Sequence, residues 1–205
     1  ATLRGLLQAP DLQQILLHTL AVAVLASGVA SLVAIPAAWV AARSGRIARA
    51  LISALGFLPL TMPPFVTAAM LERFGTAFNE TTLASRFGEI HVRGNSTALV
   101  LVFALHFLPL ILFSLMAGLE RMDRAFAESA RSLGAGGLTV WRRVTLPLAT
   151  PAYAAGAGLV LLRILEDLGT PLYLGVDQML APQLLLDLNN AGHSDPSPNI
   201  AAVAT

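Results

Sequence analysis

Four stretches of the chain are apolar and free of charged side chains over the length that a membrane-spanning helix needs, roughly 20 residues. They are bounded by Asp11 and Arg43, Arg49 and Glu72, Arg93 and Glu120, and Arg143 and Arg163. Hydrophobicity within them is continuous and lacks the alternation of a barrel strand, so helices must satisfy the backbone hydrogen bonds. The pattern predicts an all-α polytopic membrane protein with spans at 14–42, 50–71, 97–118 and 149–170, and a fifth beginning near Pro198.

The composition agrees with this pattern. Of the 205 residues, 56% are hydrophobic and 12% are charged, about half the charge of a usual soluble domain. A formal net charge of +1 argues against nucleic-acid binding, which needs a strong basic surplus. With no cysteine and four scattered histidines, we expect no disulfide, no cysteine nucleophile and no metal site. Because the chain starts without Met and stops where a new apolar run begins, we expect a fragment of a longer protein.

Arginines are distributed unevenly over the connections between the predicted spans. One side of the membrane would hold eight of them: Arg43, Arg46, Arg49, Arg121, Arg124, Arg131, Arg142 and Arg143. The other side would hold four: Arg4, Arg73, Arg86 and Arg93. Arginine-rich connections stay in the cytoplasm. The count therefore predicts that 43–49 and 119–148 are cytoplasmic and that 73–96 and 171–197 face the periplasm.

The connection at 119–148 has a pattern of its own. Over 122–135 apolar and charged side chains fall on opposite faces of a short helix, with Phe126, Ala130 and Leu133 on one and Arg124, Glu128 and Arg131 on the other. Glycine tolerates left-handed cap geometry, and the helix is expected to end at the glycines that follow: Gly134, Gly136 and Gly137. A second helix would run towards Pro147, where the missing backbone donor bends or restarts the chain. An ordinary solvated loop is the alternative.

A fixed spacing runs through this connection. Glu128, Ser129 and Ala130 are followed by three residues, Gly134, nine further residues, Val144, any residue, Leu146 and Pro147. This resembles the EAA signature of binding-protein-dependent ABC importer permeases of type I, E-A-A, three residues, G, nine residues, I-x-L-P. Ser129 and Val144 stand where that signature has alanine and isoleucine. In that family the loop is a coupling helix that docks on the ATP-hydrolysing subunit, so the resemblance implies that these seven residues couple this chain to an ATPase.

Other stretches extend the resemblance. The stretch TLAVAVLASGVASLVAIPAAWVAARSGR looks like the family's first core helix, and FLPLTMPPFVTAAML is similar to its proline-broken second one. The stretch LEDLGTPLYLG is similar to the DFGTP-x-x-LG ending of ferric-iron permeases, with Leu168 in place of Phe. The resemblance implies that 1–205 is an importer transmembrane domain, either the first half of a fused pair or a fragment. It also implies that the domain moves a small solute, with ferric iron as the favoured candidate. Polyamine, thiamine and phosphonate permeases share the scaffold and stay open.

The same resemblance implies a set of partners and no catalysis by this chain. The partners would be ABC ATPase subunits, a second permease half, a periplasmic substrate-binding protein and membrane lipid. ATP and magnesium would bind the ATPase, so no cofactor is expected here. The location would be the bacterial inner membrane. Small residues are expected to let helices approach a second half: Gly28, Ala30, Gly156 and Gly158.

Seven further residues are candidates for the solute pathway or its gate. Pro59, Pro63 and Pro64 interrupt one predicted span, and interrupted helices often mark transport sites. His106 is ionisable and lies mid-span. Three charged residues at helical spacing end the fourth span: Arg163, Glu166 and Asp167. The structural alternatives are a kink absorbed by neighbouring helices, a packed polar residue and an interfacial ion pair.

Rival functional classes fit the sequence less well. An ion-coupled secondary transporter would need acidic residues near the middle of a span, and none lies there. A membrane enzyme would need a nucleophile with a base, which His106 alone does not provide. A passive structural subunit would have no use for a coupling signature. The GAGG segment lacks the Lys and Ser or Thr of a phosphate-binding loop.

Overall fold

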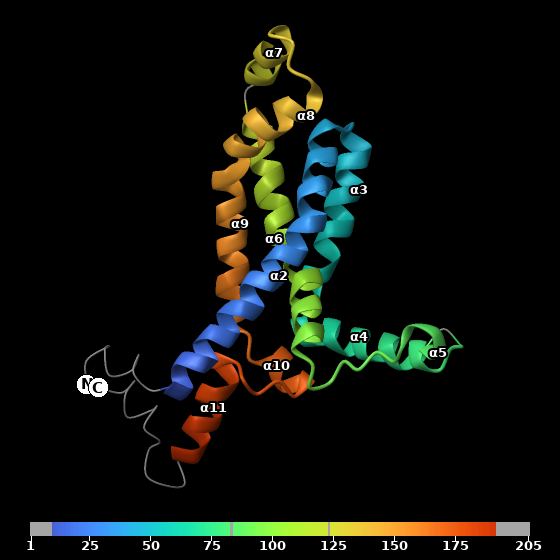
Figure 1. Cartoon of the computed structure of the whole chain (residues 1–205), viewed down its shortest axis with the longest axis vertical. Coiled ribbons are helices and arrows are strands. Elements are labelled where there is room, and N and C mark those ends of the chain that lie inside the picture. The colour runs from blue at the N-terminus through green and yellow to red at the C-terminus, as the bar shows by residue number, and fades with distance from the viewer. Residues whose placement is uncertain (1–9, 83, 123, 192–205) are drawn as a thin grey trace, which may run out of the picture. The chain divides into compact units, whose positions relative to one another are not determined.

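The computed structural model describes residues 10–82, 84–122 and 124–191, and this part of the chain is helical without a strand (Figure 1). The helices are α2 (Pro10–Arg43), α3 (Arg46–Phe57), the 3-10 turn η1 (Leu58–Thr61), α4 (Pro64–Asn79), α5 (Ala84–Phe87), α6 (Ser96–Arg121), α7 (Arg124–Ser132), α8 (Gly137–Val140), the π-helical turn η2 (Trp141–Thr145), α9 (Leu146–Glu166), α10 (Gly169–Leu174) and α11 (Leu180–Ala191). The predicted all-α class is confirmed.

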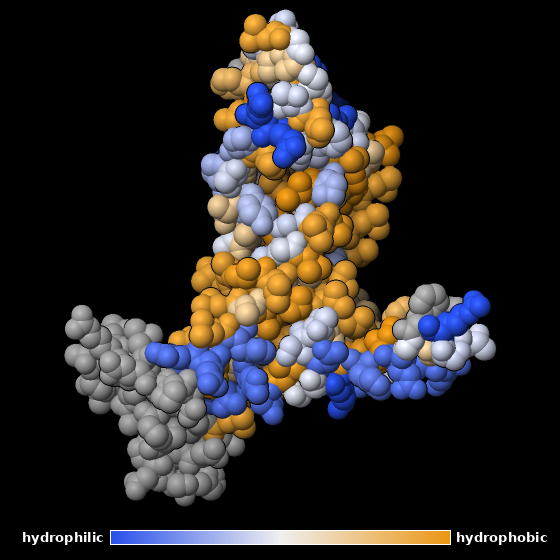
Figure 2. All heavy atoms as spheres, in the orientation of Figure 1, coloured by the Kyte–Doolittle hydropathy of each residue, from blue (hydrophilic) through white to orange (hydrophobic). Residues whose placement is uncertain are grey.

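The chain divides into two compact units. The first unit takes in Ala1–Ala26, Met62–Phe103 and Leu161–Thr205, and the second takes in Ser27–Thr61 and Ala104–Val160. In the second unit Figure 1 shows α3 beside the later part of α2, and Arg49 Nε donates a hydrogen bond of 3.3 Å to the Ala41 carbonyl. None of the residues of α3 is buried, and Figure 2 shows hydrophobic side chains over it. Such an exposed apolar surface suits contact with lipid or with other spanning helices.

Three described helices are long and apolar enough to cross a membrane: Gln13–Arg43, Ser96–Arg121 and Gly137–Glu166. The predicted spans at 14–42 and 97–118 lie inside the first two. The predicted span at 149–170 is wrong at its end, because α9 stops at Glu166. Asp167 Oδ1 accepts a 3.1 Å hydrogen bond from the backbone N–H of Thr170, and Asp167 Oδ2 accepts one of 2.7 Å from the Thr170 hydroxyl. Asp167, one residue before the N-cap position Leu168, therefore caps the first turn of the separate helix α10 through its side chain.

The predicted span at 50–71 is broken where its three prolines lie, Pro59, Pro63 and Pro64. Helix α3 ends at Phe57, η1 follows, and α4 begins at Pro64 after an extended residue, Pro63, with φ −64° and ψ 149°. A residue that precedes proline is pushed out of the helical region, and both Met62 and Pro63 precede one. Proline is favourable at the first position of a helix, where its missing N–H is not needed. The pieces Arg46–Thr61 and Pro64–Asn79 make a fourth span only if they are counted together.

Close approach of α6 and α9 in the second unit depends on glycine. A Cβ at Gly156 would lie 2.9 Å from the Ile111 Cα and 3.0 Å from the Leu110 carbonyl oxygen, and a Cβ at Gly118 would meet the Cβ of Ala152. A side chain at Gly156 would force the two backbones apart. Gly28 and Gly158, by contrast, have nothing within 4 Å of the position a Cβ would take.

Polar contacts tie the first unit together. His18 Nδ1 lies 2.9 Å from the Gln178 carbonyl oxygen, and the Thr19 hydroxyl accepts a 3.0 Å hydrogen bond from the Leu180 N–H. These bonds join the early part of α2 to the segment that leads into α11. The fifth predicted span near Pro198 lies outside the described residues.

Candidate functional site

Helix α7 forms where the sequence places a short amphipathic helix, and Gly134 closes it. The Gly134 φ is +84°, a left-handed value that glycine adopts without strain. The Ala135 N–H donates to the Ala130 carbonyl at 3.1 Å, which is the longer bond of a Schellman cap. A Cβ at Gly134 would have nothing within 4 Å, so the backbone angle rather than space requires glycine there.

The other two glycines of the loop begin the next helix and do not end α7, so that part of the prediction is wrong. Gly136 has φ −66° and ψ 158° and is the N-cap residue of α8, and Gly137 is its first residue. Neither has a positive φ. An extended N-cap residue suits a helix start, and any small residue adopts it. Of these three glycines only Gly134 is conformationally required.

A π-helical turn replaces the restart that was expected at Pro147. The Leu146 N–H donates to the Trp141 carbonyl, five residues back. Proline has no N–H, and its ring crowds the carbonyl four residues earlier, here that of Arg143. A widened turn relieves that crowding, and such turns often occur at functional positions. The helix consequently runs through from Gly137 to Glu166.

The residues of the EAA spacing all lie in the second unit, on two neighbouring segments. Glu128 and Ser129 are exposed on α7, Ala130 is half-buried, and Gly134 forms the cap. Val144 is half-buried in η2, and Leu146 and Pro147 are exposed at the start of α9. Helix α7 contacts both α8 and η2. The fixed spacing therefore describes a helix, its glycine cap and the widened turn on which the helix rests.

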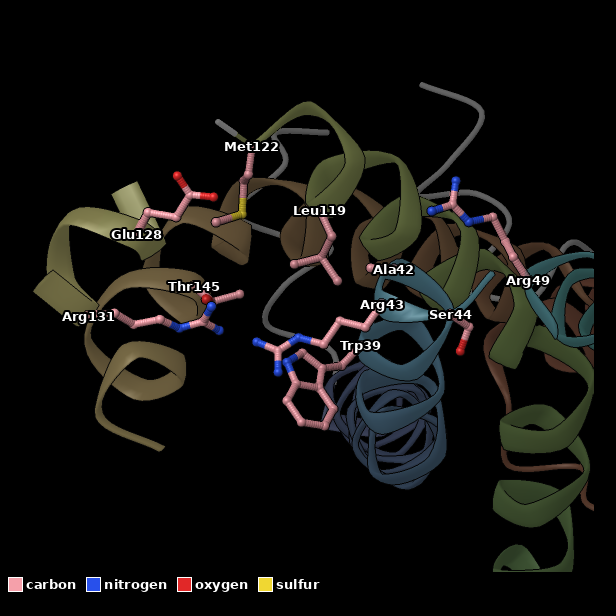
Figure 3. Close-up of a pocket in the computed structure, with 10 residues that line it drawn as sticks. All are labelled: Trp39, Ala42, Arg43, Ser44, Arg49, Leu119, Met122, Glu128, Arg131 and Thr145. Atoms are coloured by element: carbon pink, nitrogen blue, oxygen red, sulfur yellow. The ribbon is translucent and has the colours of Figure 1, made fainter. Parts of the chain in front are cut away.

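A cavity of about 430 Å³ opens beside α7 (Figure 3). It is lined by Trp39, Ala42, Arg43, Ser44, Arg49, Leu119, Met122, Glu128, Arg131 and Thr145. Figure 3 shows the guanidinium groups of Arg43 and Arg131 directed toward each other, with the Thr145 hydroxyl beside that of Arg131. The Arg43 Cζ lies 4.1 Å from the centroid of the Trp39 ring, a cation–π contact.

The charged residues of this cavity differ in how they are paired. Arg49 forms an ion pair of 2.8 Å with Glu120, which joins α3 to the end of α6. Within the described part of the chain, neither Arg43 nor Arg131 has a carboxylate within 4.0 Å, and the Glu128 carboxylate has neither an ion pair nor a hydrogen bond. The cavity thus holds charged groups that have no ion-pair partner among the described residues.

The pathway candidates lie at separate places. The three prolines form the break between α3 and α4. His106 is 3% exposed and packs edge-on to Phe107 with a centroid distance of 4.9 Å. Arg163 and Glu166 are exposed and 3.6 Å apart, whereas Asp167 bonds Thr170. The described residues hold no group of three or more His, Cys, Asp or Glu that could bind a metal ion.

Comparison with known proteins identifies the family. Residues 34–204 match the family described as binding-protein-dependent transport system inner membrane component. The chain belongs to this family. It is accordingly a multi-pass inner-membrane protein, an ABC importer permease of the type I fold, and its family works with ABC transporter partners such as an ATPase and a binding protein.

Three relatives show what this permease is similar to. The molybdenum transport system permease protein ModB of Mycobacterium tuberculosis is 32% identical over 96% of this chain and 75% of its own length. The spermidine/putrescine transport system permease protein PotB of Escherichia coli is 27% identical over 73% of this chain and 56% of its own. The Escherichia coli ModB is 31% identical over 64% of this chain and 58% of its own length. These names do not confirm the resemblance to ferric-iron permeases.

The permease has a polar cluster in its first unit that sequence reasoning missed. Arg93 Nε donates to Glu72 Oε1 at 2.6 Å, and the Tyr173 hydroxyl donates to Glu72 Oε2 at 2.7 Å. The Arg93 Cζ lies 5.4 Å from the centroid of the Tyr173 ring. Hydrogen bonding to the Glu72 carboxylate raises the pKa of Tyr173. In the sequence, Glu72 and Arg93 could be recognised only as charges at the ends of predicted spans, and no pattern indicated that Tyr173 lies beside them.

Proposed function

We propose that this permease imports a molybdenum oxyanion. The supporting observation is the similarity to ModB of Mycobacterium tuberculosis, which covers 96% of the chain. The similarity to PotB is lower and shorter, so polyamines are the second candidate. Ferric iron was favoured by the LEDLGTPLYLG stretch, but there Asp167 and Thr170 bond each other. A helix cap explains that stretch without reference to iron.

Substrate identity is tested by uptake in cells that lack their own molybdate importer. The permease would be expressed with its ATPase and binding protein, and accumulation of labelled molybdate, spermidine and ferric iron would be compared. We expect molybdate uptake alone to depend on the permease. Uptake of spermidine would favour the polyamine alternative, and uptake of iron would restore the iron assignment.

We also propose that α7 and the turn that follows it transmit ATP-driven motion. In this proposal α7 docks on a separate ATPase subunit, which binds ATP and magnesium, and Glu128 accepts hydrogen bonds from that subunit. The exposed, unpaired carboxylate of Glu128 supports this, as does the rigid cap at Gly134. A charge-assisted bond to an external donor would give this exposed carboxylate the partner that it lacks among the described residues. Coupling is then an energetic preference of each partner for one conformation.

A second permease half and a defined topology complete the proposal. Gly28 and Gly158 leave open space at which another helix could approach closely. The arginine count supports a cytoplasmic position for 119–148. Since the chain has no cysteine, single cysteines at Gly137 and Asp177 should react with an impermeant thiol reagent from opposite sides of the membrane. Reaction from the same side would refute the topology.

A further inference from the structure

Two cavities in the second unit share a wall made by Trp39 and Arg43. The first is the 430 Å³ cavity beside α7, which exposes both polar and apolar atoms. The second, of about 490 Å³, is lined by Ile35, Pro36, Trp39, Arg43, Gly137, Leu138 and Trp141. Apart from the Arg43 head group, its side chains are apolar or aromatic. An occupant of both cavities would need one charged end and one hydrocarbon end.

The polar cavity gathers hydrogen-bond donors around an empty space, and its lining also includes one carboxylate, that of Glu128. Arg43 and Arg131 direct their guanidinium groups toward each other without a carboxylate within 4.0 Å among the described residues (Figure 3). Thr145 is buried and lines the same cavity. Two facing guanidinium groups repel each other unless an anion lies between them. The geometry therefore favours an oxyanion such as a phosphate, which arginine binds through several N–H groups.

Trp39 provides an independent sign of a missing acceptor. Its Nε1 is buried and has no hydrogen-bond partner in the described part of the chain. A buried indole N–H normally finds a partner, because an unsatisfied buried donor costs about 1–3 kcal/mol. In Figure 3 this nitrogen lies on the ring edge nearest the Arg43 guanidinium. An acceptor bound by Arg43 is therefore placed to accept from Trp39 as well.

The apolar cavity shows which kind of anion fits. Trp141 packs edge-on to Trp39 with a centroid distance of 5.5 Å, and Leu138 beside it is 72% exposed. Tryptophan and arginine at the end of an apolar span are typical of the level of lipid head groups. A free phosphate would leave the apolar cavity unfilled, whereas an acyl chain would cover Leu138 and Pro36.

We propose that these adjoining cavities form a binding site for an anionic phospholipid. The phosphodiester accepts from Arg43, Arg131 and the Trp39 N–H, and one acyl chain lies along Pro36, Leu138 and Trp141. The site involves lipid rather than the transported solute, so it does not depend on which solute the permease imports.

Lipid titration of the purified transporter, with its ATPase bound, tests the site. Phosphatidylglycerol and phosphatidylcholine would be titrated separately and the bound lipids counted by native mass spectrometry. We expect phosphatidylglycerol to bind at least fivefold more tightly, and Arg43→Gln to remove about fivefold of that preference, the effect of one basic residue at an anionic membrane surface. Leu138→Ser should weaken binding of both lipids, since it removes chain contact without disturbing a buried residue.

Arg46→Gln is the matched control, because Arg46 is exposed in the adjoining segment and lines neither cavity. If Arg46→Gln and Arg43→Gln lower the preference for phosphatidylglycerol equally, the preference comes from general surface charge and the proposed site is overturned.

Displacement of the lipid by soluble glycerol phosphate at similar concentration would assign the cavity to free anions. Absence of tightly bound phosphatidylglycerol in the transporter would overturn the lipid site, leaving the cavity either empty or filled by a protein carboxylate. Trp39→Phe keeps the ring and removes the N–H, and it should weaken the binding of both lipids, because both carry the phosphodiester that accepts from that N–H.

Discussion

The connection at 128–147 and the segment at 166–175 both carry motif-like sequences, yet their polar side chains are satisfied in different ways. At 166–175 Asp167 bonds Thr170, and Tyr173 bonds Glu72, all within the first unit. At 128–147 Glu128 is exposed without a partner among the described residues, and Gly134 holds the cap of the helix that presents it. A motif that satisfies its own polar groups is explained by folding. A motif that exposes a carboxylate to solvent on a rigid element leaves that charge available to a partner.

The largest expected effect is on transport. Glu128→Arg should abolish uptake without lowering the unfolding temperature, because the carboxylate makes no contact that folding requires. ATP-driven uptake in vesicles and the thermal unfolding of the solubilised transporter would be measured together. A large loss of stability would mean that Glu128 has a structural role that the described residues do not show.

For Asp167→Ala, in contrast to Glu128→Arg, we expect a loss of stability. This variant removes both hydrogen bonds to Thr170, whose side chain is fully buried, and should lower the free energy of unfolding by about 1–3 kcal/mol. Asp177→Ala is the control, since the Asp177 side chain is exposed and, among the described residues, the hydrogen bond that Asp177 accepts goes to its backbone carbonyl. Thermal unfolding compares the two. Equal stability of both variants would contradict the capping role.

Two glycine variants test whether the backbone angle, rather than the space around the residue, makes glycine necessary at Gly134. Gly134→Ala forces a non-glycine residue to φ +84°, which costs about 1–2 kcal/mol and should reduce uptake by shifting α7. Gly136→Ala has φ −66° and open space around its Cβ, so uptake should stay close to the unaltered level. Uptake assays at matched expression decide between them. The account fails at this point if Gly136→Ala is the more damaging change.

The smallest effect is expected at Arg142, which is exposed in η2. Arg142→Ala should change the free energy of unfolding by less than about 1 kcal/mol and leave most of the uptake, because exposed charges contribute little. Uptake and co-purification of the ATPase would be measured. A complete loss of uptake in Arg142→Ala would place an essential contact outside the EAA spacing.

The sequence was sufficient for features that depend on local pattern. The spans at 14–42 and 97–118, the amphipathic helix at 122–135 and the turn at Gly134 follow from periodicity and glycine geometry. The break at 58–63 was indicated by its prolines, which push the residues before them out of the helical region. The end of α9 at Glu166 was missed, because the predicted span was carried past Glu166 and Asp167 to residue 170.

Contacts between distant residues could not be read from one sequence. Arg93 and Tyr173 lie 21 and 101 positions from Glu72, so nothing local indicates that they meet it. The cavity behind α7 likewise joins Trp39 and Arg43 to Thr145, and its shape depends on helix packing. The EAA spacing named the residues of the candidate site, while the fold supplied the surface around them.

Cross-linking from α7 to the ATPase tests the central claim most directly. The chain has no cysteine, so Ser129→Cys, which is exposed on α7, gives a single defined attachment point. With a short bifunctional reagent, Ser129→Cys should cross-link to the ATPase subunit in the assembled transporter, and the yield should change when ATP is added. Asp177→Cys, on the segment proposed to face the periplasm, should give no such product. Cross-linking of the ATPase from Asp177→Cys but not from Ser129→Cys would contradict the claim that α7 is the coupling helix.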